Sequence, residues 1–306
     1  MPKDLEKKQP LLVEIKGNSL DDGPGIRSVV FFKGCPLACD WCHNAETKRV
    51  GPELSFDATS CVKSGDCALA CRDGAIDLRR RGLVDRARCT SCFLCVPACG
   101  AGAFEVVGRT WSVAEIVQAL MRYRPFYRTS GGGVTLSGGE PTLFMEFCSE
   151  LLVELRARDI HVLLETCGDF SLERYLALID PHVDQVYFDL KIMDPEAHRR
   201  FCGRDNRRVL TNFEALYRRY LDGGTPVLPR VPLVPERTAT AENLASLASF
   251  LRETGVKRVA LLPYNPLWPD KARKVGHEVR YERKAWMSKE EVASATRFFE
   301  GFEIGG

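Results

Sequence analysis

The sequence predicts an α/β protein, a partial barrel of parallel strands interrupted by a small cysteine-rich insert. Short apolar runs alternate with helical stretches through the second half of the 306 residues. Repeated βα units imply a parallel sheet, and right-handed crossovers curl that sheet in one direction. Cysteines gather in an island of distinct composition between residues 61 and 99. The length suits one large α/β domain plus one small module.

The individual elements follow from local patterns. Ser112 and Glu115 form a capping-box pattern that predicts a helix through about Tyr123. Runs rich in β-branched or aromatic residues predict strands, and apolar residues at helical spacing predict helices. Strands are expected at 11–15, 28–32, 160–164, 183–188, 227–233 and 256–262, and helices at about 143–158, 194–201, 212–221 and 240–253.

Composition bounds the function. A formal net charge of +2 favours neither a nucleic-acid partner nor a membrane surface. Residues 1–10 lack an apolar signal core, and no run approaches the roughly 20 apolar residues that span a bilayer. We therefore expect a cytoplasmic location. Thirteen cysteines, an odd count in tight clusters, favour reduced thiols and metal over disulfides, and hence sensitivity to oxygen.

Cys35, Cys39 and Cys42 have the spacing C-x3-C-x2-C on one short loop. Thiolates that converge in this way hold iron–sulfur clusters. Three ligands leave one iron with an open position for a substrate atom, just as catalytic zinc sites keep an open position. The alternative is a zinc knuckle completed by His43 or a distant residue. Cys42 and His43 are adjacent, which disfavours both pointing at one ion.

The cysteine island has the spacing of a ferredoxin with two clusters. Its second half is C-x2-C-x2-C-x3-C, and its first half is an imperfect copy with Ser64 in place of the second cysteine. In paired clusters the fourth cysteine of each run ligates the other cluster. A structural zinc ribbon is the alternative. The crossed rule predicts one complete set, Cys89, Cys92, Cys95 and Cys71, and one incomplete set, Cys61, Cys67 and Cys99.

The incomplete set leaves three outcomes open. The site could hold a three-iron cluster, hold a four-iron cluster ligated by serine or another group, or be vestigial. Arg72 and Gly100 stand where a proline usually follows the fourth cysteine, so the local fold can deviate. The insert also carries basic residues, expected either as a solvated face or as a docking face for an acidic electron donor. These are Arg79, Arg80, Arg81, Arg86 and Arg88.

Residues 131–141 predict a strand that ends in a glycine-rich turn, Gly138-Gly139-Glu140-Pro141. No Gly-Lys-Ser/Thr follows, which disfavours a phosphate-binding loop. Glycines let a ligand approach the backbone closely, and Glu140 places a carboxylate at the edge of the turn.

Taken together, these motifs resemble the glycyl-radical-enzyme activating enzymes of the radical S-adenosylmethionine (SAM) superfamily. The resemblance rests on residues 22–27, 32–37 and 41–44, with Ala45 in place of the usual proline. It implies a six-unit (β/α) barrel with a ferredoxin-like insert after the loop of the first strand. The expected division is a barrel of residues 1–54 and 105–306 and an insert of residues 55–104.

The resemblance also assigns roles to residues. Cys35, Cys39 and Cys42 would hold the catalytic 4Fe-4S cluster, with Trp41 and His43 beside the cofactor. Gly138, Gly139 and Glu140 would hold the methionyl amino group of SAM. Contacts to SAM, or to a monovalent cation beside its carboxylate, fall to Glu165, Thr166, Asp189, Leu190, Lys191 and Arg230, and Asn265 stands where many members have histidine.

Some of these residues, and three further cysteines, have plainer interpretations. A carboxylate next to a lysine, as at Asp189 and Lys191, can be a salt bridge and nothing more. Cys148, Cys167 and Cys202 lie outside any ligand spacing, and we expect them to be ordinary small apolar residues.

The implied activity is reductive cleavage of SAM to methionine and a 5'-deoxyadenosyl radical, which removes a hydrogen atom from a glycine in a partner glycyl radical enzyme. Flavodoxin or ferredoxin would supply electrons, and one or two insert clusters would carry them or be structural. Two rivals remain. One is a radical SAM enzyme acting on a small molecule. The other is a ferredoxin-type electron carrier, which leaves the first cysteine loop unexplained.

Overall fold

The computed structural model describes residues 8–80 and 82–305, so Arg81 of the basic group and residues 1–7 lie outside the described residues. Nine strands of the described chain form one sheet in the order β11-β10-β9-β8-β7-β6-β2-β1-β5. Neighbours from β2 to β11 are parallel, whereas β1 is antiparallel to β2 and β5. The strands are β1 (Leu11–Ser19), β2 (Arg27–Phe32), β5 (Arg109–Thr110), β6 (Gly133–Gly138), β7 (His161–Thr166), β8 (Gln185–Asp189), β9 (Val227–Leu233), β10 (Arg258–Pro263) and β11 (Glu303–Gly305).

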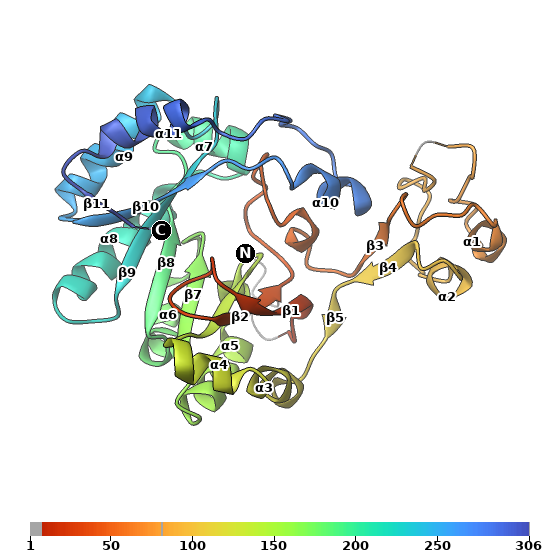
Figure 1. Ribbon diagram of the computed structural model, residues 1–306, viewed down its shortest axis with the longest axis horizontal. Coiled ribbons are helices and arrows are strands. Elements are labelled where there is room, and N and C mark those ends of the chain that lie inside the picture. The colour runs from red at the N-terminus through yellow and green to blue at the C-terminus, as the bar shows by residue number, and fades with distance from the viewer. Residues whose placement is uncertain (1–7, 81, 306) are drawn as a thin grey trace.

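The sheet curves, and most of the helices cover its outer face (Figure 1). This arrangement confirms the expected α/β fold with a large parallel sheet. β2 and β6–β10 are the six strands of the partial barrel, and β11 adds a short edge strand. The helices are α3 (Val113–Met121), α4 (Arg124–Ser130), α5 (Met145–Arg156), α6 (Leu172–Leu178), α7 (Pro195–Cys202), α8 (Arg207–Leu221), α9 (Ala241–Glu253), α10 (Pro269–Lys274) and α11 (Lys289–Thr296).

Side chains alternate across the strands and so divide the barrel into two chemical layers. Leu136, Leu164 and Phe188 pack into the main core, which the helices cover. The next residues along the same strands, Ser137, Glu165 and Asp189, belong to the opposite face, because successive side chains point to opposite sides of a strand. The apolar side chains therefore pack against the helices on the outer face of the sheet. The barrel interior near the carboxyl ends of the strands is polar.

The insert forms a small module beside the barrel (Figure 1). β3 (Glu53–Phe56) and β4 (Phe104–Val107) form an antiparallel pair separate from the main sheet. Two short helices, α1 (Asp66–Ala70) and α2 (Cys95–Ala98), lie between these strands in the chain. The module has its own apolar cluster, which includes Leu54, Phe104, Cys67 and Cys95. No helix of the described residues is long and apolar enough to cross a membrane.

A buried charge network anchors the insert to the barrel. The Lys33 ammonium, whose side chain is fully buried, lies 2.6 Å from a carboxylate oxygen of Glu53 at the start of β3. The other Glu53 oxygen lies 2.7 Å from Nε2 of His277, just beyond α10. Burial lowers the pKa of Lys33, and the Glu53 carboxylate opposes that shift. One carboxylate thus joins the cysteine loop, the insert and the segment that follows the barrel.

Glu53→Gln is expected to lower the free energy of unfolding by about 3–5 kcal/mol, because it leaves the Lys33 charge buried without its partner. Glu278→Gln is the matched control. Glu278 pairs with Arg280 at the surface, where an ion pair contributes at most about 1 kcal/mol. Denaturant unfolding of the two variants measures the difference. Equal stability of both variants would contradict a structural role for this network.

Candidate active site

The cysteine loop follows β2 at the carboxyl edge of the sheet, and backbone bonds fix its course. Gly34 N donates to Thr47 O (2.6 Å) and Cys35 N donates to Lys48 O (3.1 Å). Ala38 N donates to Cys202 O (2.8 Å) at the end of α7. None of these bonds uses a thiol. The loop therefore holds its shape without help from the three cysteine side chains.

Cys35 and Cys39 lie close enough to Cys42 to influence its pKa. Cys167 and Cys202, which lie outside the motif, are buried in the small apolar cluster to which the three loop cysteines also belong or against which they pack. The neighbouring Cys202 lowers the pKa of Cys39 to about 7, whereas burial raises the pKa of Cys42 to about 12. In the described part of the chain, no three His, Cys, Asp or Glu side chains converge closely enough for a single metal ion.

The glycine turn is bonded directly to the cysteine loop. Gly139 N donates to Phe32 O (2.8 Å) and Glu140 N donates to Gly34 O (2.7 Å). A Cβ on Gly139 would lie 2.1 Å from Gly34 O, and Gly138 has φ +101° with Phe32 N 2.6 Å from an added Cβ. Both glycines are therefore required for the turn to approach the loop, in addition to any ligand they meet.

Glu140 is fully buried and its carboxylate is occupied by protein donors. Oε1 accepts the Thr142 hydroxyl (2.6 Å) and the Thr166 hydroxyl (2.9 Å), and Oε2 accepts Cys167 N (2.7 Å). Glu140 and Thr166 thus clamp the turn after β6 to the end of β7. This geometry supports a positioning role for both residues, with the turn backbone left to meet a ligand.

A row of charged side chains crosses the interior next to this turn. Arg230 donates to Glu165 Oε1 (2.5 Å) and to Asp189 Oδ1 (2.9 Å), and Asp189 is its register partner on β8. Lys191 Nζ lies 3.1 Å from Asp189 Oδ2, and the Ser137 hydroxyl donates to Glu165 Oε2 (2.5 Å). The predicted Glu165, Asp189, Lys191 and Arg230 are therefore one connected network.

Burial and charge oppose one another in this network. Burial raises the pKa of Asp189, but Arg230 and Lys191 more than offset it and hold the pKa below its usual value. The neighbouring carboxylates raise the pKa of Arg230 above its usual value in spite of burial. Leu190 differs from its neighbours, because its side chain packs into the main core while its N–H donates to Arg230 O (2.9 Å). Only the backbone of Leu190 is on the side of the site.

His43 and Asn265 meet at the edge of the cysteine loop. Asn265 Nδ2 lies 3.3 Å from His43 Nδ1, and Leu267 N donates to Asn265 Oδ1 (3.3 Å), which orients the amide. Burial lowers the pKa of His43 to about 4, so the ring is neutral. Its buried Nε2 has no hydrogen-bond partner among the described residues and can serve a ligand. Trp41 is buried in the small apolar cluster that also contains Tyr264 and Trp268.

The insert gathers its cysteines in two groups. Cys71, Cys89, Cys92 and Cys95 are among the residues that line one small cavity. Cys61 and Cys99 lie close to Cys67. Ser64 is exposed and its hydroxyl donates to Asp66 Oδ2 (2.8 Å).

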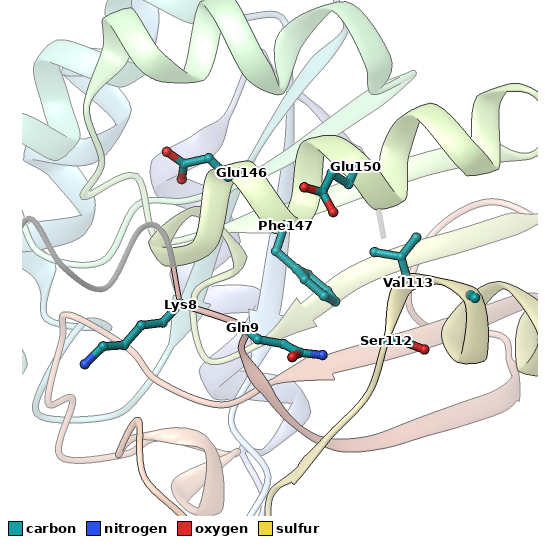
Figure 2. A pocket seen from close by; sticks show the side chains of 8 residues that line it. Lys8, Gln9, Ser112, Val113, Glu146, Phe147 and Glu150 are labelled. Carbon is teal, nitrogen blue, oxygen red and sulfur yellow. The ribbon is translucent and has the colours of Figure 1, made fainter.

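A surface groove of about 500 Å³ lies elsewhere. It is formed by residues 8–9, the start of α3 and the outer side of α5, where Glu146, Phe147 and Glu150 line it (Figure 2). None of the predicted site residues lines this groove. The candidate site is therefore defined by its side chains and not by this groove.

Comparison with known proteins agrees with the fold. A family model described as the radical SAM superfamily matches residues 87–261, more than half of the chain, and a 4Fe-4S single cluster domain matches residues 21–74. A radical SAM methyltransferase from Sphaerobacter thermophilus is similar in fold, with a TM-score of 0.50 and 19% identity over 65% of this chain and 58% of that chain. The chain belongs to the radical SAM superfamily.

Its relatives narrow the class. The isethionate sulfite-lyase activating enzyme of Desulfovibrio desulfuricans is 36% identical over 282 residues, which cover 90% of this chain and 89% of that protein. The 4-hydroxyphenylacetate decarboxylase activating enzyme of Clostridioides difficile is 32% identical over 296 residues, covering 94% and 92%. Within the superfamily, the chain is one of the glycyl-radical-enzyme activating enzymes.

Proposed function

We propose that the chain cleaves SAM at a 4Fe-4S cluster held by Cys35, Cys39 and Cys42, and that it transfers the radical to a glycine of a partner glycyl radical enzyme. When bound, the cluster supplies the electron that splits SAM into methionine and a 5'-deoxyadenosyl radical. One observation carries the proposal. The cysteine loop is bonded to the glycine turn through Gly139 and Glu140, directly beside the buried charge row.

The surrounding residues supply binding and orientation. The backbone of Gly138 and Gly139 faces the cysteine loop, where the amino group of SAM would approach the turn. Arg230 is a fixed cation suited to a carboxylate or to ribose hydroxyls, and Lys191 and Asp189 set the charge beside it. A monovalent cation near the SAM carboxylate would draw on the same two acidic residues, Asp189 and Glu165. His43 Nε2 and the Asn265 amide are the polar groups left for the adenosine end.

We further propose that the insert holds one complete and one atypical iron–sulfur cluster and carries electrons to the site. Cys92 of the complete set is exposed, so electrons can enter from a flavodoxin or ferredoxin at that surface. The basic residues of the insert offer a smaller docking face for an acidic electron donor than their number suggests. Arg86 donates to Leu54 O and Lys274 O inside the junction, and Arg80 pairs with Asp85. Arg79 has a 92% exposed side chain.

Ser64→Cys is expected to raise iron and sulfide content toward three full clusters and to change the electron paramagnetic resonance spectrum of the reduced protein. The reason is that a thiolate is a softer and better ligand for cluster iron than an alcohol or the neighbouring Asp66 carboxylate. Ser249→Cys, on the exposed face of α9, is the control for an added thiol. If the native protein already holds three ordinary all-cysteine clusters, the assignment of an atypical site is wrong.

The decisive test of the proposed function mixes the reduced protein, SAM and a candidate partner under anaerobic, reducing conditions. Such conditions keep the cysteines reduced, as in a cytoplasm. Isethionate sulfite-lyase and 4-hydroxyphenylacetate decarboxylase are the first candidates, because the relatives are named for them. We expect a glycyl doublet in the paramagnetic resonance spectrum of one partner. SAM cleavage driven by a small metabolite, with no doublet in any partner, would instead favour a small-molecule radical SAM enzyme.

A further inference from the structure

Lys48 contacts the cysteine loop with both its backbone and its side chain. It directly follows a short 3-10 helix, η1 (Ala45–Thr47), and its N–H donates to Ala45 O (3.2 Å). Its carbonyl accepts the N–H of Cys35 (3.1 Å). Its ammonium donates to the carbonyl of Cys39 (2.7 Å). Lys48 thus joins the beginning of the loop to its middle.

The bond to Cys39 places the ammonium at the turn between two of the three cysteines. The same carbonyl accepts the N–H of Cys42 (3.3 Å). The Lys48 charge therefore lies against the backbone that carries Cys39 and Cys42. The bond is partly buried, so salt and water screen this charge less than they screen one at the open surface.

No carboxylate neutralises this ammonium. Among residues 8–80 and 82–305, no Asp or Glu oxygen lies within 4.0 Å of the Lys48 nitrogen. Asp40, in the same turn, has Arg237 as its ion-pair partner (4.0 Å). Lys271, which reaches the loop from α10, is paired with Glu46 (3.2 Å). Lys48 therefore differs from this neighbouring lysine in presenting a charge without a counter-ion.

An unneutralised cation at this place has a defined effect on electron transfer. Uptake of one electron adds one negative charge to an iron–sulfur cluster, and net charge is one of the factors that set the reduction potential of a cluster. A nearby cation attracts the added charge. It therefore stabilises the reduced form more than the oxidised form.

We propose that Lys48 is a positioning residue that holds a positive charge against the cysteine loop and thereby raises the reduction potential of the cluster bound by Cys35, Cys39 and Cys42. This inference rests on the proposed function, because it requires a cluster at these cysteines, and three thiols are a donor set that fits one. One electron passes from an external donor, dithionite in vitro, to the cluster. No covalent bond of the protein forms or breaks.

The test is a redox titration with dithionite, followed by paramagnetic resonance at the spectral component that changes when SAM is added. Lys48→Gln carries an N–H donor but no charge. It is expected to lower the ratio of reduced to oxidised cluster at a fixed potential by about three- to tenfold, where tenfold corresponds to 59 mV for one electron. Lys48→Arg keeps the charge and should restore the ratio.

Arg49→Gln is the matched control. It removes the same unit of charge from the next residue, whose side chain is 68% exposed and lies 3.4 Å from Glu53. This variant should titrate like the native protein. Iron content and the SAM-dependent signal are measured in every variant.

The outcomes separate this inference from the proposed function. A Lys48→Gln variant that titrates like the native protein, with its SAM-dependent signal intact, would overturn the inference and leave the proposed function standing. An equal fall of the ratio in Lys48→Arg or in Arg49→Gln would also overturn it, because the effect would then not depend on a charge held at this position. Loss of the cluster from Lys48→Gln, with retention in Arg49→Gln, would assign Lys48 to loop structure and count against the inference. Absence of any SAM-dependent signal in the native protein would overturn the proposed function itself.

Discussion

Replacing Cys35, Cys39 and Cys42 together with serine is expected to reduce 5'-deoxyadenosine formation from SAM and dithionite to the level of a protein-free control. Three alcohols do not replace three thiolates as ligands for cluster iron. The variant should remain folded, because backbone bonds such as Gly34 N to Thr47 O and Ala38 N to Cys202 O hold the loop. Its insert should still carry iron.

The measurement is 5'-deoxyadenosine by chromatography, together with iron content and the circular dichroism spectrum. Cys148→Ser is the control for a buried cysteine outside the site. Undiminished formation of 5'-deoxyadenosine by the triple variant would contradict the assignment of the catalytic cluster to this loop.

Arg230→Met is expected to have the second large effect. Arg230 lies between Glu165 and Asp189 with a side chain only 12% exposed. Its removal leaves two nearby buried carboxylates with Lys191 as the remaining cation, which is expected to cost about 3–5 kcal/mol of unfolding free energy. SAM should also perturb the cluster spectrum less, because Glu165 and Asp189 lose the group that orients them. Arg258→Met on β10 is the control, since Arg258 pairs with an exposed Glu303.

The stability loss of Arg230→Met should depend on pH. In the native protein the pKa of Asp189 lies below its usual value, so this group stabilises the fold above its unfolded pKa, and the contribution is lost as pH falls through the folded pKa. Without Arg230, burial dominates and the folded pKa rises above the unfolded one. The variant then loses stability as pH rises through that folded pKa. The difference in unfolding free energy between the native protein and Arg230→Met should therefore become smaller from neutral toward acidic pH. A difference that does not depend on pH would contradict this electrostatic account.

The fold was largely predictable from local sequence, because the patterns are strong. Val227–Leu233 forms a strand with the expected bounds, and Ser112 and Glu115 form both bonds of the expected capping box. The helix expected from residue 212 begins at Arg207, so the prediction missed its first turn, which contains the buried Val209. The antiparallel place of β1 and the short edge strand β11 were not predicted, because strand pairing depends on partners distant in the sequence.

The site was predictable where motifs are local and less so where contacts are distant. The spacing of Cys35, Cys39 and Cys42 indicated that the three residues lie close together, and they do. Spacing carries no information on Cys167 and Cys202, which lie in the same small apolar cluster as the loop from other elements and are buried there as small apolar residues. The Glu140 clamp and the Lys33–Glu53–His277 network likewise depend on tertiary contacts.

The most direct test of the central claim follows a deuterium atom. A partner glycyl radical enzyme labelled with deuterium at the glycine α-carbon is mixed anaerobically with the reduced protein and unlabelled SAM. Hydrogen abstraction requires that α-carbon to come within roughly 3 to 3.5 Å of the adenosyl carbon. Mass spectrometry of the 5'-deoxyadenosine should show one deuterium per molecule, in step with growth of the glycyl doublet. Unlabelled 5'-deoxyadenosine formed alongside a normal doublet would contradict direct transfer from that glycine.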